Sequence, residues 1–272
     1  VKSTRVKKKG FARFVSSKNG FVKLTVKEKG DGLLEYWDGK ESLFSNELQP
    51  IFKANRDELT TPIKAGLVTS KASSRYQASA SHERWLGENY RKEWSQEIKA
   101  PVFDLTTEKG GLKIIQRGGG MQTLSLRLED SLGREYTLRS IEKFPEKAVP
   151  EAFRKTFAQD LVQDQISAAH PYGAVVVPFL AEAAGIYHTN PKVVFIPDDP
   201  HFGIYRKDFS NQLMLFEERP SGSGKGMEFF GNAEKIMGID KLLEKLAGDN
   251  DNRVDQQFVL QSRLFDLWIG DW

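Results

Sequence analysis

The sequence contains no cysteine among its 272 residues. Disulfide frameworks and thiolate metal sites are therefore excluded, and cysteine usage leaves the redox compartment open. No apolar run approaches the roughly 20 residues that a helix needs to cross a bilayer, and the first residues carry no signal-peptide pattern. The formal net charge is only +3, which gives no electrostatic argument for binding nucleic acid. What remains is the composition of a globular protein, with 39% hydrophobic and 28% charged residues.

Metal-binding motifs are also missing. The four histidines are scattered, and none lies near carboxylates at a recognisable ligand spacing. The cluster Asp-Asn-Asp-Asn at 249–252 lacks the glycine of a calcium loop, and Leu260 stands where the bidentate glutamate should be. We expect this cluster to cap a helix over residues 253–269, and we expect Asp198 and Asp199 to form a turn. No metal site is predicted.

The most informative stretch covers residues 110–143, which predict three consecutive β-strands. The strands are expected at 112–116, around 124–128 and at 136–141. Three glycines separate the first two strands, and an Asp-Ser-Leu-Gly turn separates the last two. Because a strand rather than a helix follows the glycines, the dinucleotide fingerprint and the P-loop are excluded.

A strand–glycine–strand hairpin suits the lid that kinase-like folds place over nucleotide phosphates. Backbone N–H groups of Gly118, Gly119 and Gly120 would approach an anion closely, since no side chain intervenes. Alternation along the third strand puts Thr137 and Arg139 on one face. Arg139 is therefore the candidate phosphate-binding cation, and Thr137 would line the nucleotide side. The competing interpretation is an ordinary hairpin with a flexible glycine tip.

A helix is predicted from residue 151 to about residue 169, directly after Pro150. In a kinase-like lobe, the helix after the third strand offers a carboxylate to the cation of that strand. We therefore predict an ion pair between Arg139 and Asp164, with Asp160 as the substitute partner. The alternative is that both aspartates are solvated. The expected apolar stripe comprises Phe153, Phe157, Leu161, Val162 and Ile166.

Further elements follow this helix. Residues 173–184 predict a mostly apolar, buried helix, and residues 192–196 and 211–216 predict two strands. Glu217 and Glu218 continue the second of these strands into a polar segment, which would be the hinge that hydrogen-bonds adenine. Residues 239–246 predict a short helix.

The segment 50–100 differs from its surroundings because it starts with a linker-like tract rich in serine and alanine. Its later part interleaves Trp85, Tyr90 and Trp94 with basic residues. Such aromatic residues can stack on nucleotides. We favour docking against a neighbouring domain, with the basic side chains extending to water.

Two runs near the start, STRVKKKG and FVSSKNGFVKLTVKEKGDGLLEYWDG, resemble the last strands of a calcineurin-like metallophosphoesterase domain. The matching subfamily occurs in large bacterial cell-envelope proteins. The region from about residue 90 to 272 resembles the central part of the same proteins, which precedes an outer-membrane barrel of the surface-antigen type. This second resemblance depends on the runs NYRKEW, RGGGMQTLSLRLEDSLGREYTLRSIEKFPEKAVPE, LVQDQISAAHPYGA, IPDDPHFGIYRKDF, LFEERP and DNDNRVDQQFVLQSRLFDLWIGDW.

These resemblances imply a location in the cell envelope, with neighbouring domains of the same polypeptide as partners. The central region is also similar, more distantly, to atypical kinases of the spore-coat and secretory-pathway types, which implies ATP with Mg²⁺ as cofactor. The phosphoesterase motifs D-x-H, GDxxxxG and GNH[DE] do not occur, so the two-metal centre of that domain is absent here. The kinase Asp-Arg-His motif is missing too, and Arg139 replaces the usual lysine. No catalytic residue is predicted.

The expected fold class is α+β. We predict a β-rich tail of a phosphoesterase-like domain at 1–49, a linker or docking segment at 50–100, and a kinase-like small lobe of antiparallel sheet plus helix at 101–222. The start of a helical large lobe, truncated, is expected at 223–272. The predicted function is a nucleotide- or phosphate-binding module, with no contact to nucleic acid or membrane. The alternatives are a structural connector between phosphoesterase and barrel, and a kinase that is active when the missing catalytic loop is present.

Overall fold

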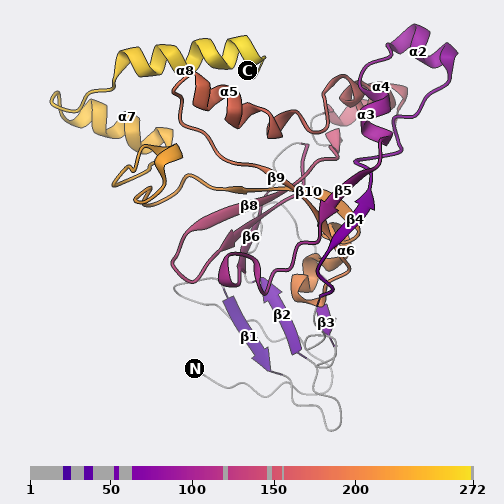
Figure 1. The fold of residues 1–272 in the computed structure, drawn as a ribbon, viewed down its shortest axis with the longest axis horizontal. Coiled ribbons are helices and arrows are strands. Elements are labelled where there is room, and N and C mark those ends of the chain that lie inside the picture. Colours follow the sequence, from indigo (N-terminus) through magenta and orange to yellow (C-terminus); the bar gives the residue numbers. More distant parts are fainter. Residues whose placement is uncertain are drawn as a thin grey trace. The chain divides into compact units, whose positions relative to one another are not determined.

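The structure is a computed structural model that describes residues 63–118, 122–145, 149–154 and 156–270. It also describes the backbone of three strands before them, β1 (Phe21–Thr25), β2 (Leu34–Asp38) and β3 (Phe52–Ala54). The chain divides into two compact units (Figure 1). The first comprises Val1–Lys64 and Asp198–Ser210, and the second comprises Ala65–Pro197 and Asn211–Trp272.

The first unit contains an antiparallel sheet in the order β1-β2-β3. β1 and β2 lie in the β-rich tail predicted at 1–49, whose other residues are outside the described ones. The 3₁₀ helix η6 (Pro200–Tyr205) and α6 (Arg206–Phe209) also belong to this unit. The Asp199 side chain accepts a hydrogen bond from the N–H of His201, so it begins η6 as an N-cap where a turn was predicted.

The second unit is built on a five-stranded antiparallel sheet, which establishes the α+β class. The strands lie in the order β6-β7-β8-β10-β9. The strands predicted at 112–116, 124–128, 136–141, 192–196 and 211–216 are all confirmed to within about two residues at each end. Their bounds are β6 (Lys113–Gly118), β7 (Ser125–Glu129), β8 (Glu135–Ser140), β9 (Lys192–Ile196) and β10 (Gln212–Glu218).

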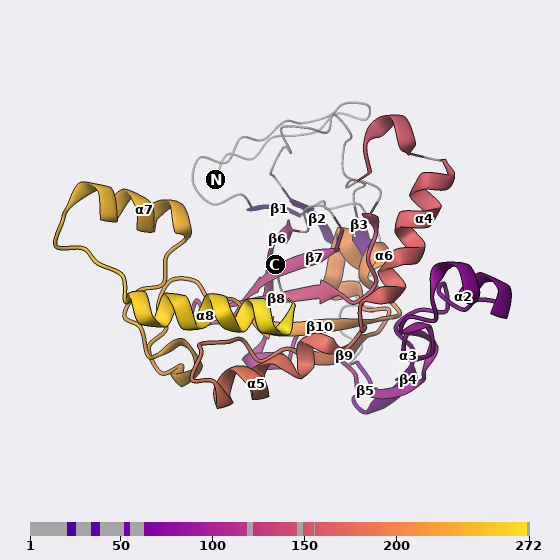
Figure 2. The ribbon, with the colours of Figure 1, turned by 90° about the horizontal axis from the view of Figure 1, so that it is seen from above.

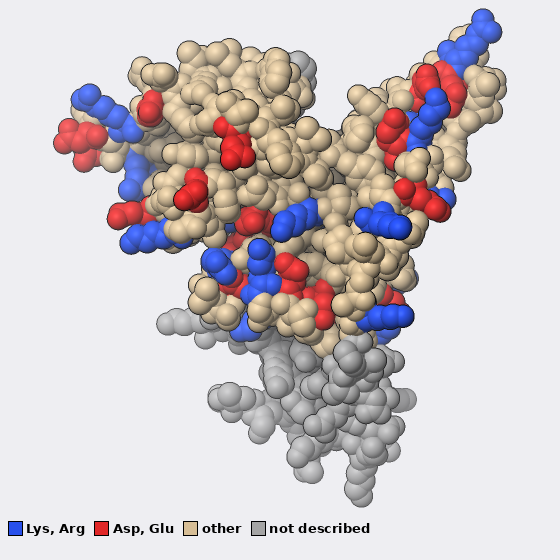
Figure 3. Space-filling model, viewed as in Figure 1, with Lys and Arg blue, Asp and Glu red and all other residues tan. Residues whose placement is uncertain are grey.

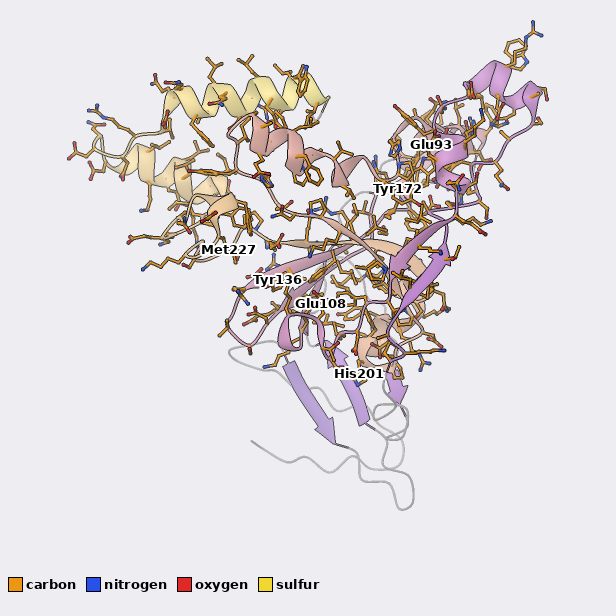
Figure 4. The ribbon with its side chains drawn as sticks, viewed as in Figure 1. Glu93, Glu108, Tyr136, Tyr172, His201 and Met227 are labelled. Atoms are coloured by element: carbon orange, nitrogen blue, oxygen red, sulfur yellow. The ribbon has the colours of Figure 1, made fainter. Side chains whose placement is uncertain are left out.

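One face of this sheet forms the main hydrophobic core. Alternate residues of three central strands point into it, because successive side chains of a strand face opposite sides. The Phe216 ring lies 5.1 Å from that of Phe103 and 5.4 Å from that of Tyr136, the residue of β8 that is labelled in Figure 4. The buried residues of this face are Leu126, Leu128, Tyr136, Leu138, Met214 and Phe216.

The opposite face is divided into an apolar half and a polar half. The apolar half is covered by a second cluster that includes Tyr76, Trp94, Ile166 and Leu213. Trp94 was predicted to dock, and it is buried, with its indole N–H donating to the carbonyl of Ala169 at 2.9 Å. The polar half contains the candidate site described below.

Much of the segment 50–100 therefore belongs to the second unit and is not a separate linker. It contributes β4 (Leu67–Ser70), α2 (Ala80–Leu86), α3 (Arg91–Ser95) and β5 (Ile98–Pro101), and β4 pairs with β5. One of the basic side chains expected to extend to water is instead buried, since Arg91 is only 2% exposed, whereas Trp85 is 85% exposed. Arg91 is tolerated inside because a carboxylate neutralises it, as shown below.

The helix predicted at 151–169 is divided into three pieces. These are the 3₁₀ helix η3 (Glu151–Phe153), α4 (Phe157–Gln165) and the 3₁₀ helix η4 (Ile166–Ala168). Thr156 has an extended backbone, and its side chain accepts a hydrogen bond from the N–H of Ala158, so a new helix begins there. Only Ile166 of the predicted apolar stripe is buried, whereas Phe153 and Phe157 are exposed.

The other helices depart from expectation in burial and in capping. α5 (Val177–Ala183) was predicted to be buried with its neighbours, but Phe179 is 70% exposed. α8 (Gln256–Ile269) is capped by Asp255, which accepts from the N–H of Phe258, rather than by the cluster at 249–252. The Asn252 side chain instead donates to the carbonyl of Lys245 at the end of α7 (Ile239–Gly248). Among its described residues the unit also contains three short 3₁₀ helices, η1 (Glu108–Gly110), η5 (Gly173–Val175) and η7 (Glu228–Phe230).

The main core predicts a large effect of truncating its central side chain. Leu138 is fully buried in β8, so Leu138→Ala removes packed methyl groups and leaves a cavity. We expect a loss of about 2–5 kcal/mol in the free energy of unfolding, measured by urea denaturation. Leu132→Ala is the matched control, because that leucine is exposed in the β7–β8 turn and should cost less than about 0.5 kcal/mol. Equal losses in the two variants would contradict this assignment of the core.

Candidate functional site

The polar half of the sheet face brings Gly118 and Arg139 into one row of paired residues. Gly118 pairs with Ser125, and Ser125 pairs with Arg139. Residues directly opposite each other in a sheet direct their side chains to the same face. A Cβ added at Gly118 would lie 2.7 Å from the Ser125 hydroxyl oxygen, so a larger residue there would displace the serine. Gly119 and Gly120 lie outside the described residues.

Thr137 and Arg139 share this face, as the alternation along β8 predicts, and Leu138 between them is buried on the other side. Glu217 of β10 pairs with Thr137 in the register and joins the same face. The Arg139 guanidinium Nη2 lies 3.0 Å from the Glu217 carboxylate Oε1. The arginine side chain is 49% exposed and that of the glutamate 14%, so the cation remains accessible to solvent.

The predicted ion pair between Arg139 and Asp164 is wrong. Both oxygens of Asp164 bind Arg91 of α3, at 2.8 Å from Nη1 and 2.7 Å from Nη2, and His82 Nε2 lies 2.9 Å from Oδ1. Asp160, the predicted substitute, is exposed on α4. The physical reason is burial, because a guanidinium withdrawn from water needs a bidentate carboxylate more than a half-exposed one does.

Asp164 thus joins α3 and α4, which lie side by side with α2 in Figures 1 and 2. Hydrogen bonds from Arg91 hold the pKa of the Asp164 carboxyl below its ordinary value, against the opposing effect of desolvation. The same pair raises the pKa of Arg91. Sequence reasoning missed Arg91 because its partner lies 73 positions away, a separation that no local pattern reveals.

Glu217 and Glu218, the two glutamates predicted as a hinge, accept hydrogen bonds from a neighbouring loop through their side chains. The Thr189 hydroxyl donates to Glu217 Oε2 at 2.8 Å, and the N–H of Asn190 donates to Glu218 Oε2 at 3.1 Å. The next backbone donor of the segment, the N–H of Arg219, is hydrogen-bonded to the carbonyl of Glu135 at 2.9 Å. Glu217 therefore has two partners, Arg139 on one oxygen and the loop on the other.

A second ion-pair cluster lies on the same face. Glu135 Oε2 lies 3.4 Å from Arg127 Nε and 3.2 Å from Arg219 Nη1. The Ser221 hydroxyl donates to the other oxygen of Glu135 at 2.9 Å. Together with the Arg139–Glu217 pair, three arginines meet two glutamates, which leaves one positive charge in excess (3 − 2 = 1).

A cleft of about 240 Å³ lies beside Glu217. Its walls come from α5, α8 and the segment 186–191, and polar and apolar groups share them about equally. The polar residues are Tyr187, His188, Thr189, Glu217 and Asp266. The volume is somewhat below the usual range of roughly 300–1,000 Å³ for a ligand pocket, so it suits a ring-sized group. Sequence reasoning did not find this cleft, because its walls come from segments separated by about 90 residues. The lining residues are Ala174, Val177, Pro178, Ala181, Ile186, Tyr187, His188, Thr189, Pro191, Glu217, Phe265, Asp266 and Ile269.

Within the described ranges, no three histidine, aspartate or glutamate side chains converge to form a metal site. Among the helices of the same ranges, none has both the length and the hydropathy needed to cross a membrane. Comparisons with protein-family models, with curated proteins and with solved structures found no match to this chain.

The Arg91–Asp164 pair predicts a large effect of removing the carboxylate. In Asp164→Ala the guanidinium of Arg91 stays buried without a counter-charge, so we expect a loss of about 3–5 kcal/mol in the free energy of unfolding. Denaturant unfolding followed by circular dichroism measures the change. Asp160→Ala removes an aspartate from the exposed side of the same helix and should cost less than about 0.5 kcal/mol. A loss of that small size in Asp164→Ala would show that the pair is dispensable.

Proposed function

We propose that this chain is a nucleotide- or phosphate-binding, kinase-like module of a large cell-envelope protein. The observation that carries the proposal is the position of Arg139. It stands on the polar face in the same row as Gly118 and Ser125, and its partner Glu217 also lines the cleft. The carboxylate of Glu217 therefore contacts the Arg139 cation and also lines the cleft.

The chemistry of this face suits an anion. A guanidinium carries five N–H donors in a rigid fork, and the contact with Glu217 leaves donors of Arg139 for a phosphate. Gly118 presents backbone without a side chain, and the Ser125 hydroxyl lies beside it. The single excess positive charge among the paired arginines and glutamates favours the same ligand.

The arrangement of elements supports the kinase-like part of the proposal. An antiparallel sheet carries a glycine at the end of its first strand and a cation on its third, and α4 follows the third strand in sequence. One departure matters, since Glu217 of β10 replaces the predicted aspartate of α4 as the partner of Arg139. We propose binding rather than phosphoryl transfer, and we assign no catalytic residue.

The cleft gives a nucleotide a place for its base. Apolar side chains of α5 and α8 line part of it and would contact a planar ring, and Glu217 and Asp266 in the same lining offer hydrogen-bond acceptors. Arg139 lies on the other side of Glu217 from the loop at Thr189. A ligand with its phosphates at Arg139 and its base in the cleft would extend past this glutamate.

A structural connector is the second candidate function, and one observation favours it. Arg127, Arg139 and Arg219 each have a carboxylate partner on the same face. Such a network can hold β8 to β10 and to the segment after β10 without any ligand. The two candidates differ in whether an added anion stabilises the fold.

Calorimetric unfolding with ATP and Mg²⁺ separates the two candidates. A ligand that binds only the folded chain stabilises it by about 2.7 kcal/mol at a concentration of 100 Kd. We expect millimolar ATP with Mg²⁺ to raise the Tm, and Arg139→Ala to abolish the increase. Lys241→Ala, which removes an exposed cation from α7, is the matched control and should retain it.

One further ligand, tripolyphosphate, identifies which part of the nucleotide is bound. Stabilisation by tripolyphosphate as strong as that by ATP would mean that the face binds only the phosphates. Stabilisation by ATP but not by tripolyphosphate would mean that the cleft also contributes to binding. No change in Tm with any of these ligands would refute the binding proposal and support the connector.

A further inference from the structure

The side chains that line the cleft beside Glu217 offer mainly hydrogen-bond acceptors. His188 Nδ1 lies 3.0 Å from the carbonyl oxygen of Thr189. A carbonyl cannot donate, so the proton of the neutral ring is on Nδ1, and Nε2 is an acceptor. The Thr189 hydroxyl donates its proton to Glu217 Oε2 at 2.8 Å. The donors of these side chains are therefore used within the protein, and lone pairs remain for a ligand.

Asp266 is the second carboxylate of the lining, and one of its oxygens is available. Arg263 Nη1 donates to Oδ2 at 2.7 Å, and within the described ranges no group is hydrogen-bonded to Oδ1. A carboxylate oxygen has two lone pairs, so Oδ1 can accept two hydrogen bonds from a ligand. The Asp266 side chain is 32% exposed, so it is accessible to a ligand that enters from solvent.

Basic side chains add no further donors to the cleft. The sequence of α5 contains no lysine or arginine, and Arg263 is the only one in α8. In Figure 3 the surface over these two helices shows few basic side chains. Among the described lining residues, the remaining side-chain donor is the hydroxyl of Tyr187, which lies against Gly231. The cleft therefore favours a ligand that brings its own donors.

The carboxylates of the cleft are already paired, which favours a neutral ligand over a cation. Glu217 Oε1 lies 3.0 Å from Arg139 Nη2, and Asp266 Oδ2 lies 2.7 Å from Arg263 Nη1. Because each carboxylate has a guanidinium partner, an amine or guanidinium ligand would bring a charge without a counter-charge into a partly enclosed site. A neutral ring with N–H donors meets the acceptors without this cost.

Among the nucleobases, guanine has the matching arrangement of donors. Its N1–H and N2–H₂ lie side by side, whereas adenine and cytosine have one amino group beside an unprotonated ring nitrogen. That nitrogen is an acceptor, so it would face the Asp266 carboxylate without a hydrogen. Adenine would also need a backbone donor, and the N–H of Arg219, which follows the predicted hinge, is already bonded to the carbonyl of Glu135 at 2.9 Å.

We propose that the cleft recognises guanine, with Asp266 as the specificity-determining residue. This inference rests on the proposed nucleotide-binding function and adds the identity of the base. N1–H and N2–H₂ of the base donate to Asp266 Oδ1, while Arg263 keeps its hydrogen bond to Oδ2. Apolar side chains of α5 and α8 contact the ring, and the phosphates extend past Glu217 to Arg139.

Isothermal titration calorimetry with GTP, ATP, ITP and XTP tests the base preference, because the triphosphate and the Mg²⁺ are the same in each. We expect GTP to bind at least about tenfold more tightly than ATP, since a bidentate contact to a base discriminates by about ten- to a hundredfold. ITP lacks the 2-amino group and keeps N1–H, so its Kd should fall between those of GTP and ATP.

Asp266→Asn exchanges an acceptor oxygen for an N–H donor, and we expect it to remove the preference for GTP over ATP. The same variant should bind XTP more tightly than the wild-type chain does, because xanthine carries a carbonyl in place of the 2-amino group. A gain of binding cannot result from a loss of structure. Arg263→Ala is the matched control, since it removes the partner of Asp266 but keeps the carboxylate, and it should retain the preference for GTP.

Equal dissociation constants for GTP and ATP in the wild-type chain would overturn the guanine assignment and leave nucleotide binding intact. A preference for GTP that Asp266→Asn retains would overturn the role of Asp266. No binding of any of the four nucleotides, together with no change in Tm with tripolyphosphate, would refute the proposed function itself and the guanine assignment with it.

Discussion

The second unit depends on the alternation of side chains across one antiparallel sheet. Along β8, Tyr136 and Leu138 enter the main core, while Thr137 and Arg139 face the other way. The strands on either side obey the same alternation, so a slip of one residue would exchange the core residues with the polar ones. Burial of the leucines and the aromatic rings thus fixes the position of Arg139, although the arginine contributes little to the core itself.

The two arginines differ in how their carboxylate partners hold them. Arg91 is withdrawn from water and binds both oxygens of Asp164, whereas Arg139 meets one oxygen of Glu217 and keeps about half of its side chain exposed. A buried guanidinium without its carboxylate would be strongly destabilising. Arg139 is not enclosed in this way, because about half of its side chain is in contact with water beside Glu217.

The strands could be predicted because their signals are local. Alternation between 112 and 141, with turn residues between the strands, was enough to place β6, β7 and β8 and the face of Arg139. The ion pairs could not be predicted, because the partner of Asp164 lies on a helix 73 positions earlier and local patterns do not measure burial.

The burial of the helices could not be predicted from the sequence either. The apolar content of residues 173–184 indicated a buried helix, but a sequence does not show whether the chain itself supplies the covering layer, and Phe179 is exposed. The cleft beside Glu217 could not be predicted for a related reason, since its walls on α5 and α8 meet only through tertiary packing.

The central claim is that the face carrying Arg139 binds phosphate. NMR of the ¹⁵N-labelled chain, titrated with ATP and Mg²⁺, tests it most directly, because the Arg139 Nε–H and the backbone N–H groups of Gly118 and Ser125 report on this row individually. We predict saturating shift changes at these three groups, with the Nε–H of Arg263 on α8 unchanged. Saturating changes elsewhere with none in this row, or no change at millimolar nucleotide, would contradict the claim.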